Sequence, residues 1–248
     1  MSHHIVAVRD LCFAYPDGTQ ALKGISFEIR HGGAVALIGA NGAGKSTLLL
    51  HLNGYLTPSS GEVRIGETPL TRQTAALARR AVGMVFQDPD DQLFMPTVFD
   101  DVAFGPLNLG LAREEVERRV GRALDRVGMP HLRNRPPYKL SAGEKRAVAI
   151  ATVLSMEPDI LVMDEPSTHL DPRGRRRVIE LLKSFEHTKI IATHDLELVV
   201  EVCPRVIVLD GGRAVAEGAT SEILDDEPLM LAHGLERPHI LRHQHPHI

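Results

Sequence analysis

The chain has 248 residues, of which 43% are hydrophobic and 24% charged, a composition typical of a folded protein with a sizeable core. Its net charge of -4 argues against nucleic acid as the main partner, because phosphate backbones require a basic surface. The two cysteines, Cys12 and Cys203, lie far apart and do not form the CxxC pair of a metal or redox site. Such sparse cysteine use, without a disulfide framework, indicates a reducing compartment. No apolar run approaches the roughly 20 residues that cross a bilayer, and the N-terminus MSHHIVAVRD lacks the apolar stretch of a signal peptide. We therefore expect a cytoplasmic chain that reaches a membrane only through a partner.

The N-terminal third favours short strands separated by turns. Segments rich in β-branched residues occur at positions 5–8, 25–29 and 62–65, with Pro, Gly, Asp and Ser between them. Residues 34–38 form a short, wholly apolar run, which is typical of a buried parallel strand. A glycine-rich loop follows, and we predict a helix over residues 46–52.

Farther along the chain, buried strands alternate with helical segments. The later strand candidates are residues 81–86, 160–163, 190–193 and 206–209. Between the first two lies a stretch in which apolar residues recur at helical spacing while Arg and Glu occupy the other face. Strands that alternate with helices predict a doubly wound α/β core, with this stretch as a helical insertion.

Residues 39–46 read Gly-Ala-Asn-Gly-Ala-Gly-Lys-Ser, which fits the phosphate-loop pattern GxxxxGK[ST] in full. Glycines let main-chain N–H groups approach phosphate oxygens, and the following helix directs its positive end at the same place. We expect Lys45 to contact the β- and γ-phosphates of a bound triphosphate and the Ser46 hydroxyl to hold Mg²⁺. An ordinary glycine-rich turn is the alternative, which the strand before and the helix after disfavour. The residues expected to bind nucleotide here are Gly39, Asn41, Gly42, Ala43, Gly44, Lys45, Ser46 and Thr47.

Two carboxylates, Asp164 and Glu165, follow the apolar run 160–163. Because doubly wound sheets bind ligands outside the carboxyl ends of their strands, we expect Asp164 beside the phosphate loop, where it helps to hold Mg²⁺. Glu165 has no metal to neutralise it in this scheme, so it is suited to polarise the attacking water as a general base. Two solvated acids that cap a strand are the alternative.

Residues 140–144, Leu-Ser-Ala-Gly-Glu, resemble the LSGGQ signature of the ATP-binding cassette (ABC) ATPases and precede the acidic strand as in that family. Ser141 and Glu144 also fit an S-x-x-E capping box, and the two interpretations are compatible because a capped helix N-terminus attracts anions. The resemblance implies that Ser141, Gly143 and Glu144 contact ATP held by the other subunit. It therefore implies a homodimer with two composite ATP sites.

Other ABC motifs follow in order over about residues 5–218. Gln87 resembles the Q-loop glutamine, His194 the switch histidine, and residues 167–171 the D-loop at the dimer seam. Tyr15 resembles the aromatic residue that stacks on adenine, with a core tyrosine as the alternative. The implied catalytic residues are Lys45, Gln87, Glu165 and His194, and the implied Mg²⁺ ligands are Ser46, Gln87 and Asp164.

The resemblance implies a P-loop NTPase fold of the ABC type, an α/β core with an antiparallel β subdomain and a helical subdomain. We expect residues 1–218 to form the ATPase domain, 88–155 the helical subdomain within it, and 219–248 a His-rich extension. Ala142 replaces a signature glycine, at a cost of about 1–2 kcal/mol if that position requires a positive φ. Glu144 replaces glutamine and adds negative charge near the nucleotide, and His169 is unusual in a D-loop. We expect the first two replacements to slow turnover without abolishing it.

Residues 85–106 resemble the energy-coupling-factor branch of the family, especially the cobalt and nickel uptake ATPases. That resemblance implies a transmembrane coupling subunit, substrate-binding membrane subunits, and a peripheral position at the cytoplasmic face of the cell membrane. Leu93, Phe94 and Met95 suit a groove that receives a coupling helix; the alternative places them in the helical core.

Histidines gather near the C-terminus, at positions 239, 243, 245 and 247. Imidazoles bind Ni²⁺, Co²⁺ and Zn²⁺, which favours a divalent metal as cargo; a solvated tail without a metal role is the alternative. Vitamin uptake stays open. Two further possibilities are a non-transport ABC ATPase, which usually carries two cassettes or a coiled coil, and a metal-storing or metal-sensing protein, which has no need of complete catalytic motifs.

Overall fold

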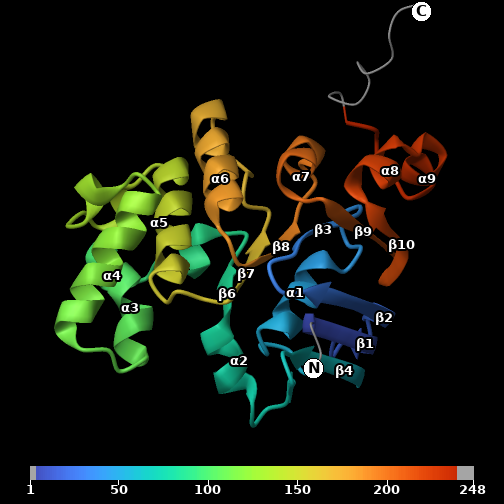
Figure 1. Ribbon diagram of the computed structural model, residues 1–248, viewed down its shortest axis with the longest axis horizontal. Helices are drawn as coiled ribbons and strands as arrows, with labels where there is room; N and C mark the ends of the chain where they lie inside the picture. The colour runs from blue at the N-terminus through green and yellow to red at the C-terminus, as the bar shows by residue number, and fades with distance from the viewer. Residues whose placement is uncertain (1–3, 239–248) are drawn as a thin grey trace, which may run out of the picture. The chain divides into compact units, whose positions relative to one another are not determined.

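The computed structural model describes residues 4–238 (Figure 1). The chain divides into two compact units. The first combines the chain up to residue 79 with the chain from residue 187 onward, and the second spans residues 80–186. Within the described range, the helices are all too short or too polar to span a membrane.

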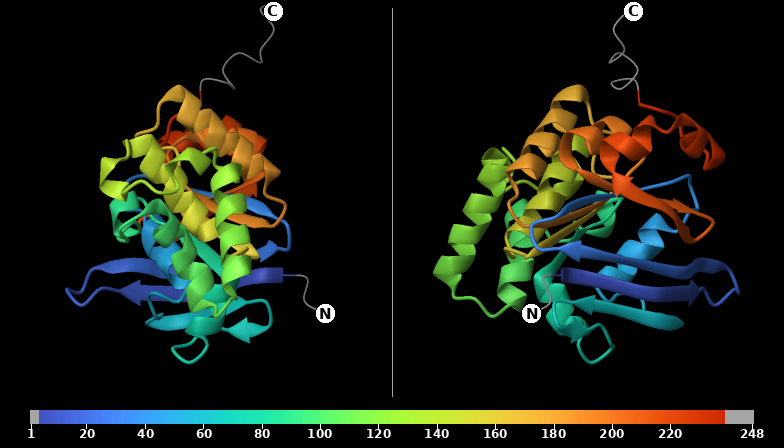
Figure 2. Two further views of the ribbon diagram at one scale, coloured as in Figure 1. Left: turned by 90° about the vertical axis from the view of Figure 1, so that its left-hand side faces the viewer. Right: turned by 45° about the vertical axis from the view of Figure 1, so that its right-hand side comes forward.

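The first unit contains an antiparallel sheet in the order β2-β1-β4-β5, visible as the blue and teal strands of Figure 2. Its strands are β1 (His4–Ala14), β2 (Gln20–Arg30), β4 (Ser60–Ile65) and β5 (Thr68–Pro69). The first two are longer than the sequence predicted. The pairing of β1 shifts register between Val8 and Leu11, and Asp10 adopts a positive φ of 45°. This bulge interrupts the alternation by which a strand is recognised.

The same unit holds a second group of strands in the order β10-β9-β3-β8. The central strand β3 (Ala34–Ile38) pairs in parallel with β8 (Thr188–Ala192) and with β9 (Arg205–Asp210), and every residue of β3 and β8 is buried. The edge strand β10 (Arg213–Ala219) pairs antiparallel with β9. The helices of this unit are α1 (Lys45–Leu52), α7 (Leu196–Val202), α8 (Thr220–Asp225) and α9 (Glu227–Ala232).

In the second unit, β6 (Val82–Val85) pairs in parallel with β7 (Ile160–Asp164). Its helices are α3 (Val98–Asn108), α4 (Arg113–Arg126), α5 (Ala142–Leu154) and α6 (Pro172–Ser184), and the first three pack on one another (Figure 1). The buried side of α4 consists of Val116, Val120, Ala123 and Leu124, which are the apolar residues that predicted a helix here. Three short 3₁₀ turns connect these elements, at Pro89–Asp91, Pro130–Leu132 and Pro137–Lys139.

Some predicted boundaries were wrong by one or two residues. The strand predicted to start at Ala81 starts at Val82, because Ala81 ends α2 (Ala75–Ala81). The strand predicted over residues 190–193 is β8, which spans residues 188–192. The α/β class and the antiparallel sheet are confirmed. So is the helical character of the segment between Gln87 and the acidic pair Asp164 and Glu165.

Candidate nucleotide-binding site

The phosphate loop follows β3 directly, and its glycines are required by the surrounding main chain. A Cβ on Gly39 would lie 2.1 Å from the carbonyl oxygen of Leu209, so no side chain fits there. Gly44 adopts a φ of 102°, and a Cβ on it would lie 2.8 Å from the carbonyl oxygen of Ala21. The neighbouring strands therefore fix both ends of the loop.

Lys45 is the first residue of α1 and its ammonium group lies inside the loop. Nζ donates to the carbonyl oxygens of Gly39 at 2.7 Å and Ala40 at 3.2 Å, and the residue is 7% exposed. The N-cap Gly44 offers no side-chain acceptor to the first N–H groups of α1. This leaves main-chain donors at the positive end of a helix for an anion to occupy. Ser46, in the same turn, is exposed.

Tyr15 lies beside this helix. Its hydroxyl is 2.9 Å from Oγ1 of Thr47, and its ring meets that of Phe13 edge to face, with centroids 5.0 Å apart. The residue is half-buried, unlike a core tyrosine. The structure thus brings Tyr15, just after β1, to the first turn of the phosphate-loop helix.

His194 lies at the same sheet edge as the phosphate loop. It follows β8, which runs parallel to β3, and the N–H of the preceding Thr193 donates to the carbonyl of Leu37 at 3.2 Å. Asp195 then caps α7 by accepting from the N–H of Leu198 at 2.9 Å. The carboxyl ends of the two parallel strands therefore present His194 and the loop on one side.

In the second unit, Asp164 and Glu165 stand at the carboxyl end of β7. They are 4% and 6% exposed, so two carboxyl groups are almost fully removed from solvent. Glu165 also adopts a φ of 48°, in the left-handed region that residues other than glycine rarely occupy. Backbone strain of this kind is concentrated at functional sites.

Gln87 follows β6, the parallel neighbour of β7, and is exposed. Its main chain is held by Arg146 of α5, which donates from Nη2 to the carbonyl of Gln87 and from Nη1 to that of Phe86 at 2.7 Å. Arg146 is 2% exposed, and this burial lowers its pKa, against the attraction of Asp88, Asp164 and Glu165.

Sequence reasoning missed the anchoring role of Arg146. A signal was present, because Arg146 shares one helical stripe with Ala149, Ile150 and Val153, all of them buried. A basic residue on a buried stripe requires specific acceptors, which here are the two carbonyls of the Q-loop.

The signature residues form the N-terminus of α5, and the predicted capping box is confirmed. Glu144 Oε2 accepts from the N–H and the Oγ of Ser141, at 2.8 and 2.9 Å, and the Ser141 Oγ accepts from the N–H of Glu144 at 3.3 Å. The main-chain hydrogen bond from Ser141 is the largest cause of the lowered pKa of Glu144. Ala142 does not adopt a positive φ, so the backbone cost considered for it does not arise.

The D-loop leads from β7 into α6. Asp171 caps that helix by accepting from the N–H of Gly174 at 2.7 Å, with Pro172 in the first helical position, a residue order typical of a helix start. His169 adopts a φ of 62°, and histidine tolerates this region better than most residues. Signature and D-loop residues line one cavity of about 670 Å³ in this unit.

The apolar residues after the Q-loop divide between core and surface. Leu93 is buried, whereas Phe94 is 62% exposed and packs edge to face on Phe104, itself 43% exposed, with ring centroids 5.1 Å apart. Oδ1 of the buried Asp101 accepts from the N–H groups of Phe94 and Met95, at 3.0 Å each. The loop that presents the two aromatic rings is therefore fixed.

The C-terminal histidines at positions 239, 243, 245 and 247 lie outside the described residues. Within residues 4–238, no group of three or more His, Cys, Asp or Glu side chains has the arrangement of a metal site.

Comparison with known proteins decides the family. The family model described as ABC transporter matches residues 22–168, more than half of the chain. The chain belongs to the ABC transporter family. Its ATPase fold and its activity, ATP hydrolysis coupled to transport, follow from this membership.

Three proteins illustrate the similarity. A putative ABC transporter ATP-binding protein of Geobacter sulfurreducens is 67% identical over 96% of each chain. The energy-coupling factor transporter ATP-binding protein EcfA of Methanocaldococcus jannaschii is 48% identical, over 96% of this chain and 87% of that protein. The structure of cbiO1 of Clostridium perfringens, described as part of the ABC transporter complex cbiONQ, gives a TM-score of 0.82 at 41% identity, over 97% of this chain and 98% of that one. The resemblance to the energy-coupling-factor branch is thereby confirmed.

Proposed function

We propose that this ABC ATPase drives an energy-coupling-factor importer for a divalent metal ion, cobalt or nickel. The branch is supported by the 48% identity to EcfA and by the similarity to cbiO1 over 97% of the chain. The metal is supported by the sequence around residues 85–106 and by the histidines near the C-terminus. The observation that carries the motor function is the phosphate loop, whose glycines and buried Lys45 have the form that a triphosphate requires.

ATP binding is assigned to the loop residues 39–47, with Tyr15 stacking on the base. Lys45 Nζ exchanges its carbonyl partners for the β- and γ-phosphates, a gain because the carbonyls are neutral whereas the phosphates carry full negative charge. The donors available for Mg²⁺ are the Ser46 hydroxyl, the Asp164 carboxylate and the Gln87 amide oxygen, the oxygen ligands that Mg²⁺ prefers. When bound, Mg²⁺ would neutralise phosphate charge.

Hydrolysis of ATP to ADP and phosphate requires a base for the attacking water. We assign this role to Glu165, whose burial and left-handed backbone fix the direction of its carboxylate. His194 is assigned to the γ-phosphate, since it follows the strand next to the one that leads into the loop. Gln87 orients water, and Arg146 holds its main chain.

The ATPase is proposed to work as a homodimer at the cytoplasmic face of the membrane, beneath a transmembrane coupling subunit and substrate-binding subunits. The capped N-terminus of α5, with Ser141, Gly143 and Glu144, would meet the nucleotide of the partner copy. Phe94 and Phe104 offer an exposed aromatic pair to a coupling helix.

Replacement of Lys45 by Ala tests the motor. Calorimetric titration of the purified chain with MgATP should show binding that the variant loses, and phosphate release by the assembled complex should stop. Normal turnover of the variant would refute the assignment of the loop.

Uptake of radioactive cobalt and nickel tests the cargo, in cells that express the chain together with the membrane subunits that co-purify with it. Uptake should require an intact Lys45. ATP-dependent uptake of a vitamin instead of metal would support the second candidate, the same motor serving another micronutrient.

A further inference from the structure

The C-terminal end of α9 has a fixed shape. The N–H of Gly234 donates to the carbonyl of Leu231 at 3.2 Å, and that of Leu235 to the carbonyl of Met230 at 2.8 Å, with Gly234 at a φ of 69°. This is the hydrogen-bond pattern of a Schellman motif. Met230 and Leu235 are both buried, which supplies the apolar contact that usually accompanies the motif. The segment is therefore held on the first unit by its own core residues.

This helix end lies against the phosphate loop. A Cβ on Gly234 would be 3.8 Å from the Cβ of Ala40, the second residue of the loop. Because glycine lacks that Cβ, the distance means that the turn after α9 lies about one methyl group away from the loop at Ala40.

A second connection runs through the side chain of His233. Its Nδ1 lies 2.9 Å from Oδ2 of Asp210, the last residue of β9. Because a carboxylate only accepts, the imidazole donates from Nδ1. The His233 side chain is 21% exposed, so this contact is partly shielded from water.

The end of β9 in turn sets the position of the loop. Gly212, two residues after Asp210, donates from its N–H to the carbonyl of Ala43 at 3.2 Å. The Leu209 carbonyl lies so close to Gly39 that a Cβ there would come within 2.1 Å. The phosphate loop is thus bounded at both Gly39 and Ala43 by the segment that His233 contacts.

We propose that His233 is a positioning residue for ATP binding, acting through Asp210 on the phosphate loop. This inference rests on the proposed role of that loop. The contact keeps the turn after α9 beside Ala40 and holds the end of β9, whose Gly212 bonds Ala43, so the loop N–H groups are ordered before the nucleotide arrives. A site ordered in advance loses less conformational freedom on binding and binds more tightly.

The test compares MgATP affinity of the full chain by calorimetry. His233→Ala should weaken binding by about threefold to tenfold, the range expected for the loss of one ordinary hydrogen bond, because this one is partly exposed and acts on the loop indirectly. His233→Asn should recover most of the affinity, because the asparagine amide can donate from nearly the same position as Nδ1. Asp210→Ala breaks the same contact from the other side and should match His233→Ala, and the double variant should be no weaker than either.

Arg237→Ala is the matched control. It removes the ion pair of Arg237 with Asp225 in the same C-terminal segment but leaves the contact with β9 in place, so its affinity should equal that of the wild type. Wild-type affinity for MgATP in both His233→Ala and Asp210→Ala would overturn the proposal. So would losses in His233→Asn and in Arg237→Ala that are as large as the loss in His233→Ala. Absence of MgATP binding by the wild-type chain would instead refute the proposed role of the phosphate loop.

Discussion

The guanidinium of Arg146 donates to the main-chain carbonyl of Gln87 and so joins the signature helix to the Q-loop. Helix α5 carries the signature at its first turn and this arginine one turn later. A change at Ser141 or Glu144 that tilts the helix therefore acts directly on the main chain of the glutamine assigned to Mg²⁺ and water.

Arg146→Ala should lower the free energy of unfolding by about 2–3 kcal/mol, because it leaves two carbonyls of a partly buried loop without their charged donor. Turnover should also fall, since Gln87 loses its anchor. Denaturant unfolding and phosphate release measure the two effects. Arg146→Lys keeps the charge but not the forked geometry, and should recover only part of either. Arg126→Ala, at an exposed position on α4, is the control; a loss in that variant as large as in Arg146→Ala would count against a specific anchor.

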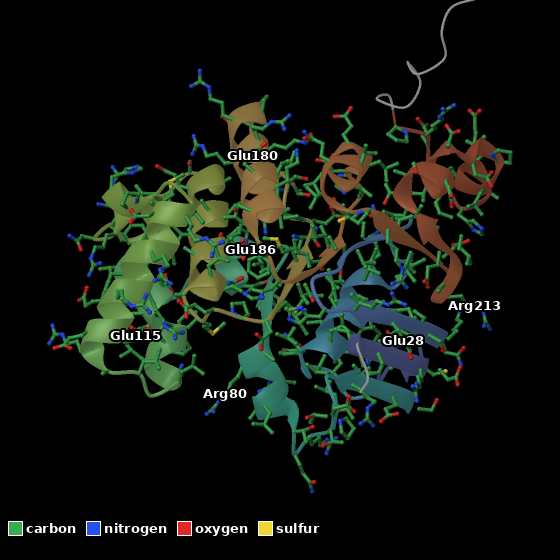
Figure 3. All side chains as sticks on the ribbon, viewed as in Figure 1. Glu28, Arg80, Glu115, Glu180, Glu186 and Arg213 are labelled. Atoms are coloured by element: carbon green, nitrogen blue, oxygen red, sulfur yellow. The ribbon has the colours of Figure 1, made fainter. Side chains whose placement is uncertain are left out.

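Glu165→Gln should leave ATP binding largely intact and reduce turnover by about 100-fold or more, because an amide cannot accept the proton of the attacking water. Single-turnover phosphate release measures the rate, and gel filtration with ATP should show an accumulated dimer. Glu180→Gln, on the exposed surface of α6 (Figure 3), should behave as wild type. Native turnover in Glu165→Gln would show that another group is the base.

Glu144→Gln should strengthen ATP-dependent association of two copies. The capping box survives, since the amide oxygen can still accept from the Ser141 N–H, but the negative charge that we propose faces the partner's triphosphate disappears. A gain of about fivefold at low salt is expected from the removal of one like charge, and it should shrink as salt rises. Analytical ultracentrifugation at two salt concentrations measures this. A gain that is independent of salt would point to packing instead of charge.

The two cysteines should differ in reactivity. Cys203 is buried, and burial raises its pKa to about 12, with Lys189 opposing the shift. At pH 8 only about one molecule in ten thousand then carries the thiolate that reacts. Iodoacetamide should therefore modify the half-buried Cys12 first, and Cys203 only after unfolding. Mass spectrometry of Cys12→Ser, which should stay unmodified in the native state, provides the check; rapid labelling of that variant would contradict the burial of Cys203.

The structural features that were best predicted are those that depend on a short stretch of adjacent residues. Strand β3 was placed with correct bounds because a wholly apolar run between glycine turns has few other interpretations. The phosphate loop and the capping box at Ser141 each need only a few adjacent residues. They could therefore be read before any tertiary contact was known.

Features that depend on distant pairing were not predictable in this way. Strand β10 has mostly exposed residues without alternation and exists because β9 offers it a partner. The contact between His233 and Asp210 joins residues 23 positions apart, and no spacing rule connects them. The domain boundaries at 88–155 and 219–248 remain a prediction.

The hydrogen bond between Tyr15 and Thr47 bears on which nucleoside triphosphate the ATPase binds. Because the phenol oxygen is hydrogen-bonded to Thr47, in the proposed stacking role Tyr15 presents to a nucleobase chiefly the face of its ring. A ring face attracts adenine and guanine alike, and it carries no donor or acceptor that would tell them apart. If Tyr15 stacks on the base as proposed, it discriminates little between purines, and any preference for ATP must come from other residues of the site.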